Sequence, residues 1–124
     1  MSDKYGPNTE AVEAFLAKVT SMTEEQCDKL AEAWSSISLW LWLSTSMAAT
    51  SAVTYNVREY AWRAAYNAWV RNLPSFCMFG HTEAMQAMCG ALVALVAKDL
   101  IEEEDFKMLC GPWKSVMEVE NDRS

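Results

Sequence analysis

Twenty-five consecutive residues, Ala33 to Val57, carry no charge, and this stretch constrains the fold more than any other feature of the sequence. Residues 37–43 alternate Leu, Trp, Ile and Ser and are too apolar for an exposed loop. Ser44 to Thr54 are mostly small residues, which allow another backbone to approach closely. The stretch is therefore expected to contact the protein's own core, a second copy, a foreign partner or a membrane.

Length and composition favour one packed helical domain. The chain has 124 residues, 52% of them hydrophobic, with only 4 Gly and 3 Pro, which is typical of a single α-helical core rather than a disordered chain. We expect a flexible lead-in at residues 1–8, a helical domain at 9–117 and a charged tail at 118–124. The polar start and the absence of any CxxC pair predict a reduced, cytoplasmic protein.

Hydrophobic periodicity predicts the first helices. The residues Val12, Phe15, Leu16 and Val19 form one apolar stripe of a helix that begins near Glu10. Thr23 and Gln26 have the spacing of a capping box, which predicts a second helix start. No Gly or Pro follows until Pro74, so this helix is expected to be long, with a kink or short connection within Ser44–Thr54.

Three further helices complete an all-α, single-domain bundle of five to six helices with a long, kinked central helix. The segment 56–72 has an aromatic stripe and an alanine stripe, which predicts a central helix covered on two faces. Residues 84–99, with Thr82 as N-cap, are expected to form a buried helix. A short acidic helix is expected at 102–109, ended by Cys110-Gly111-Pro112.

The sequence has more Trp, six in total, than a monomeric core of this length needs, which favours binding to another protein or self-association. The candidate interface residues combine the uncharged stretch with the one basic and aromatic concentration of the chain: Trp40, Trp42, Met47, Arg58, Trp62, Arg63, Tyr66 and Trp69. In the alternative interpretation, the arginines stack on core aromatic rings and extend to water.

Catalytic, cofactor and metal sites are not predicted. Cys77 and His81 could form a metal site or a nucleophile–base pair, but a structural zinc site needs four ligands and His81 is the only histidine. Glu102 to Asp105 fan around a helix axis and match a solvated helix start. A net charge of −7 disfavours nucleic acid as a partner.

Membrane association through residues 33–57 is the main alternative. The length suffices for a span, and Trp34 and Tyr55 lie near its ends. Nine Ser or Thr residues lie inside the stretch, however, and Ser44 to Ser46 would fall at the centre of the bilayer. We therefore favour a buried or oligomer-forming helix over a membrane segment, with an interfacial or partner-docking segment as a further alternative.

Several short motifs carry a resemblance to known sequences. The helix start Thr23–Gln26, the segments 91–93 and 99–101, and the Gly-Pro-Trp-Lys-Ser-Val run at 111–116 resemble a group of short, Ala- and Trp-rich helical proteins of actinobacteria and their phages. The chain departs from the group between Trp34 and Tyr55, where uncharged residues replace most of the charged ones. The group has no established activity, so the resemblance implies a helical fold and a phage or prophage origin, with action in the host cytoplasm.

Overall fold

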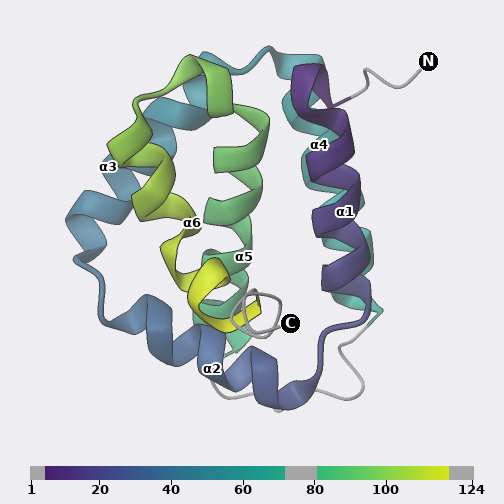
Figure 1. Cartoon of the computed structure of the whole chain (residues 1–124), viewed down its shortest axis with the longest axis vertical. Helices are drawn as coiled ribbons and strands as arrows, with labels where there is room; N and C mark the ends of the chain where they lie inside the picture. The colour runs from purple at the N-terminus through teal and green to yellow at the C-terminus, as the bar shows by residue number, and fades with distance from the viewer. Residues whose placement is uncertain (1–4, 72–80, 118–124) are drawn as a thin grey trace.

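The computed structural model describes residues 5–71 and 81–117, and in this part of the chain every regular element is helical (Figure 1). The α-helices are α1 (Thr9–Thr20), α2 (Glu24–Ser35), α3 (Leu39–Ala52), α4 (Tyr55–Val70), α5 (His81–Val96) and α6 (Glu103–Met117). Two short 3₁₀ helices, η1 (Gly6–Asn8) and η3 (Lys98–Leu100), precede α1 and follow α5. The all-α bundle predicted from the sequence is confirmed.

Helix α5 lies at the centre of the bundle. It contacts α1, α2, α3, α4 and α6, and Figure 1 shows the other helices arranged around it, with α2 crossing below its first turns. The segment 56–72 was predicted to have this central position on the strength of two apolar stripes. That prediction is wrong, because only the alanine side of α4 is covered and most of its aromatic residues are exposed.

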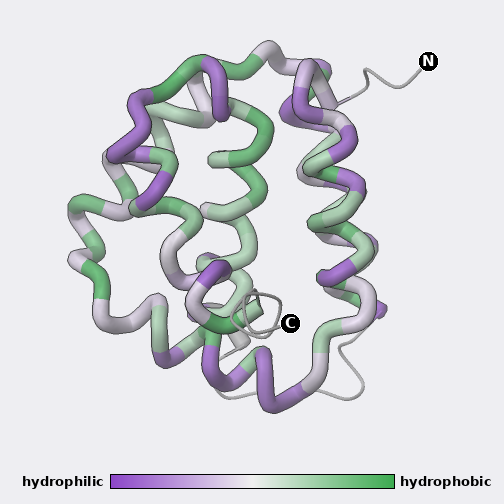
Figure 2. Tube along the Cα trace, viewed as in Figure 1, coloured by the Kyte–Doolittle hydropathy of each residue, from purple (hydrophilic) through white to green (hydrophobic). Residues whose placement is uncertain are grey.

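Small and medium apolar side chains make α5 suitable for the centre. Its fully covered residues include Ala84, Ala87, Met88, Ala91 and Leu92, and Figure 2 shows the helix in green to pale green along most of its length. Alanine at so many positions lets neighbouring helix backbones approach closely on several sides. The predicted burial of this segment is therefore confirmed.

The contact between α3 and α5 depends on one glycine. The indole ring of Trp42 lies directly against the backbone of α5 at Gly90, where a Cβ atom would overlap the ring. Trp42 is only 1% exposed as a result, and its ring meets that of Trp34 edge to face, with centroids 6.1 Å apart. Gly90 thus forms the recess that docks α3 on the core.

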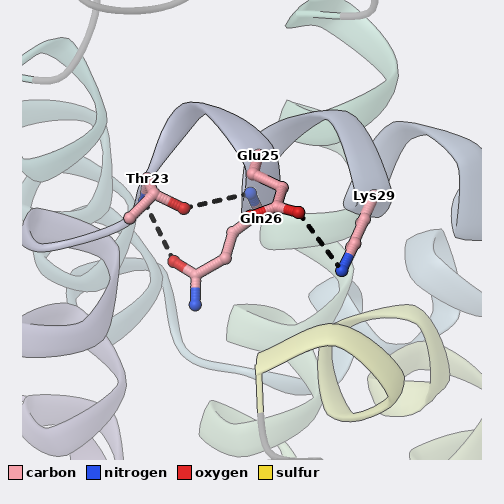
Figure 3. A network of polar contacts seen from close by, with 4 residues as sticks. All are labelled: Thr23, Glu25, Gln26 and Lys29. Atoms are coloured by element: carbon pink, nitrogen blue, oxygen red, sulfur yellow. Dashed lines mark hydrogen bonds and ion pairs between the residues drawn. The ribbon is translucent and has the colours of Figure 1, made fainter.

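The start of α2 is the predicted capping box. The Thr23 hydroxyl accepts a hydrogen bond from the Gln26 amide at 3.1 Å, and the Gln26 side chain accepts one from the Thr23 amide at 2.9 Å (Figure 3). One turn further on, the Lys29 ammonium lies 3.7 Å from the Glu25 carboxylate. The two hydrogen bonds of the capping box satisfy amides that the first turn of a helix leaves without intrahelical partners.

The long segment after Thr23 divides into three helices. The break at Val53 and Thr54, both extended, falls within the predicted region. A second break at residues 36–38 was not predicted; there the Ser36 hydroxyl donates to the Ala33 carbonyl at 2.8 Å and Ser38 caps α3. Serine side chains compete with the helix for backbone groups, so three of them within four residues end α2.

Helix α6 continues through the sequence that was predicted to end it. Gly111 and Pro112 lie inside the helix, which runs on to Met117. An interior proline costs about 3 kcal/mol, because it removes one backbone hydrogen bond and crowds the preceding turn. Burial of Trp113 and Met117 offsets that cost, and Trp113 packs against Phe15 of α1 with ring centroids 4.4 Å apart.

Both ends of α5 and the start of the chain also differ from prediction. Helix α5 begins at His81, so Thr82 is an interior residue and not the N-cap, and the helix ends at Val96. Near the N-terminus, Tyr5 is buried and the Thr9 hydroxyl donates to the Gly6 carbonyl at 2.7 Å, so residues 5–8 belong to the packed fold. Gly6 has a φ of 84°, which suits glycine at this turn.

Candidate protein-binding surface

Helix α3 exposes most of its large apolar side chains. Trp40 is 83% and Met47 67% exposed, and Leu39 and Leu43 are also exposed. Leu39, Leu43, Ser46 and Thr50 follow one another at the spacing of a single helix face. Trp40 and Met47, seven residues apart, lie along the neighbouring side of the helix.

Helix α4 exposes a stripe of aromatic side chains. Tyr55, Trp62 and Tyr66 are all exposed and recur at i, i+7 and i+11, which places them on one face. Another side of α4 is covered through Ala61, Ala65 and Ala68, and Trp69, seven residues after Trp62, is buried where the aromatic stripe reaches the end of the helix. Apolar side chains therefore lie on two sides of α4. The alanine side is covered, and the aromatic side is exposed along most of its length.

A pocket of about 560 Å³ lies between the two exposed stripes. Ser46 and Thr50 of α3 form one wall, and Tyr55, Arg58 and Trp62 of α4 form the other. Its floor belongs mainly to α5, through Met85, Cys89, Leu92, Val93 and Val96. Tyr55 and Trp62 line this pocket together with Ser46 and Thr50 of the α3 face. The two exposed stripes therefore meet at the pocket.

We refer to the exposed apolar residues on both sides of this pocket as the α3–α4 surface. Its members are Leu39, Trp40, Leu43, Met47, Tyr55, Trp62 and Tyr66. None of them is charged, and the α3 part comes entirely from the uncharged stretch.

Polar contacts fix the charged groups beside the pocket. The Arg58 guanidinium donates to the Thr50 carbonyl at 3.2 Å and lies over the Tyr55 ring, 5.6 Å from its centroid. Glu59 accepts a hydrogen bond from the Tyr55 hydroxyl at 3.4 Å, and its carboxylate lies 3.7 Å from Arg63. Arg58 thus ties the start of α4 to the end of α3, across the break at Val53 and Thr54.

The structure divides the predicted interface residues into two groups. Trp40, Met47, Trp62, Arg63 and Tyr66 are exposed, and Arg58 is partly buried beside the pocket. Trp42 and Trp69 are 1% and 0% exposed. Their assignment to the interface needs correction, because Trp42 fills the recess at Gly90 and Trp69 is buried in the core near the end of α4.

Other members of the surface were missed. Leu39 and Leu43 are exposed on the α3 face whose Ser46 and Thr50 line the pocket, and the exposed Tyr55 lines it directly. From the sequence, Leu39 and Leu43 were expected within one long helix after Thr23, and Tyr55 was not among the candidate interface residues. The spacing of Tyr55, Trp62 and Tyr66 was a signal that could have identified the stripe. The floor from α5 had no such signal, since it depends on how three helices pack.

Burial controls the chemistry of the Cys89 thiol in the pocket floor. It raises the pKa of Cys89 from an ordinary value of 9.0 to about 12, because the apolar surroundings disfavour the thiolate. Cys89 is therefore a neutral, weakly reactive part of the lining at physiological pH.

The sequence also left open a metal site, a Cys77–His81 pair and a membrane span. Within residues 5–71 and 81–117, no three His, Cys, Asp or Glu side chains come together as a set of metal ligands. Cys77 lies outside the described residues, as does the side chain of His81. Of the helices described, none is both long enough and apolar enough to cross a membrane.

Comparisons of the chain with models of protein families, with curated proteins and with solved structures gave no significant match.

Proposed function

We propose that this protein is a non-enzymatic binding protein that associates with a second copy of itself through the α3–α4 surface. The single observation that supports this proposal most strongly is the exposure of seven large apolar side chains on α3 and α4, of which Tyr55 and Trp62 line the pocket where the two helices meet. A helix face of this kind is ordinarily covered by another helix.

The size of the surface fits a dimer. Aromatic side chains have areas of about 150–250 Å², and with this range for all seven residues their fractional exposures correspond to roughly 600–1,000 Å². The largest apolar patch on a monomeric protein is ordinarily about 300–600 Å². A stable protein–protein interface buries about 800 Å² per partner, which this surface alone can supply.

The net charge opposes association of two copies, and its distribution decides where they can meet. The chain has a net charge of −7, so two copies repel each other at long range. The seven residues of the α3–α4 surface are uncharged, and the two charged residues that the structure describes in the pocket between them, Arg58 and Glu59, have opposite signs, so this part of α3 and α4 adds little to the repulsion. Salt screens the remaining repulsion, and association should therefore strengthen as ionic strength rises.

Light scattering coupled to size-exclusion chromatography tests this proposal. The wild-type chain should have twice its monomer mass of 14.0 kDa, with dissociation on dilution or at low salt. Trp40→Asp should give a monomer with unchanged helical circular dichroism, since Trp40 makes little contact within one chain. Tyr60→Asp is the matched control, because Tyr60 is an exposed aromatic residue on a different face of α4.

Three results would contradict the proposal. A monomer at every concentration would mean that a second copy does not cover the surface. A dimer that persists in Trp40→Asp would place the contact elsewhere. A dimer lost equally in Trp40→Asp and Tyr60→Asp would show that the effect is not specific to this surface.

A further inference from the structure

We propose that the pocket between α3, α4 and α5 binds a small amphiphilic carboxylate, with its apolar chain on the α5 floor and its carboxylate on Arg58. One protomer supplies all the lining residues of this pocket, so the inference does not rest on the proposed dimer. A volume of about 560 Å³ suits a small ligand.

The floor selects an apolar group. Met85, Leu92, Val93 and Val96 present only hydrocarbon and thioether groups to the pocket, and the Cys89 thiol beside them stays protonated. Trp62 adds an aromatic wall at the open side. An unbranched alkyl chain would bury its surface against these groups, and Met adapts to varied ligand shapes.

Arg58 selects the charge of the ligand. Of the residues that the structure describes, two charged ones line the pocket, Arg58 and Glu59. Glu59 already has a cation beside it in Arg63 and a donor in the Tyr55 hydroxyl. Arg58 has no ion pair within the described residues, so it is the charge in the lining without a counter-ion there.

The geometry of Arg58 leaves donors for a ligand. One guanidinium nitrogen donates to the Thr50 carbonyl at 3.2 Å, and Tyr55 supports the side chain from one side. A guanidinium has five N–H donors in a planar fork that matches a carboxylate. The contacts with Thr50 and Tyr55 therefore hold Arg58 in place and leave the rest of the fork available at the pocket wall.

Isothermal titration calorimetry with decanoate, below its micelle concentration, tests this site on the full chain. Decanoate should bind with a stoichiometry of one per chain and at least about tenfold more tightly than decyltrimethylammonium, which has the opposite charge and an alkyl chain one carbon longer. Arg58→Gln should weaken decanoate binding about tenfold. Arg71→Gln is the matched control and should leave it unchanged, because Arg71 is exposed at the other end of α4, does not line the pocket and has no ion pair with Glu59.

Val93→Phe provides a second test that keeps Arg58 intact. The larger ring should occupy the pocket floor and remove decanoate binding, with helical circular dichroism confirming that the chain is folded. The proposal is overturned if decanoate does not bind, if the cationic amphiphile binds equally well, or if either folded variant, Arg58→Gln or Val93→Phe, binds decanoate like wild type. The dimer proposal is judged separately, from the mass of the ligand-free protein.

Discussion

Helices α3 and α5 have similar compositions and opposite surroundings. Neither has a charged residue beyond the first turn, and both are rich in small and apolar side chains. Five helices contact α5, whereas α3 has its main contacts with α5 and α6. In Figure 2 the tube is pale to green along both helices, so hydropathy alone does not show which one is covered.

The contrast is sharpest between two tryptophans of α3. Trp40 and Trp42 are separated by one residue, yet the first is 83% exposed and the second 1%. Positions two apart on a helix point in very different directions, so one indole meets Gly90 and the other meets solvent. Apolar composition predicts that a helix will be covered, but the number of neighbours decides how much of it one chain can cover.

Substitution of the two tryptophans tests this contrast and should give the largest effect. Trp42→Ala should lower the free energy of unfolding by about 3–5 kcal/mol, because it leaves a cavity against α5. Trp40→Ala should change it by less than about 0.5 kcal/mol in dilute, monomeric protein, since it removes an exposed side chain. Urea unfolding followed by circular dichroism measures both, and equal losses would refute the assignment of one indole to the core and the other to the surface.

Local patterns were predicted well from the sequence. The stripe from Val12 to Val19 places Val12, Phe15 and Val19 in the core, and the Thr23–Gln26 capping box forms as its spacing indicates. Both features depend on residues within a few positions of each other. The burial of residues 91–97 was also evident, because an almost continuous apolar run leaves no solvent-facing side.

Features that depend on packing between helices were not predicted. The contact between Trp42 and Gly90 joins residues far apart in the sequence, and it decides which tryptophan of α3 is buried. Likewise, Pro112 remains within α6 because Trp113 and Met117 gain burial against other helices. The α3–α4 surface was recognised as apolar, but its members and its pocket follow from the break at Val53 and Thr54.

Two glycines on the central and C-terminal helices should respond in opposite directions to alanine. At Gly90 the added Cβ overlaps the Trp42 ring, an overpacking cost of about 1–3 kcal/mol that exceeds the gain of about 1 kcal/mol in helix propensity. At Gly111 nothing beyond the chain neighbours and the local helix backbone lies within 4 Å of the added Cβ, but the ring of Pro112 crowds the Cβ of a preceding helical residue, so alanine should stabilise α6 by no more than about 0.5 kcal/mol. Thermal or urea unfolding measures both, and stabilisation by Gly90→Ala would mean that α3 does not dock through Trp42.

The Cys89 thiol lies on the side of α5 that faces the pocket between α3 and α4. Burial raises its pKa from 9.0 to about 12, so above pH 9 the unfolded chain loses this proton while the folded protein keeps it. The free energy of unfolding should therefore be unaffected below pH 9 and fall above it, by up to about 1.4 kcal/mol per pH unit until the folded thiol ionises.

Unfolding in urea at about pH 7 and about pH 10 measures this loss, and Cys89→Ala is the reference that removes it. Because other groups titrate over the same range, the difference between wild type and Cys89→Ala isolates the contribution of this thiol. The wild type should lose about 1 kcal/mol more than the variant between the two pH values. An equal loss of unfolding free energy in wild type and Cys89→Ala would mean that water reaches the Cys89 thiol freely. The floor of the pocket would then be exposed to solvent, as the outer face of α3 is.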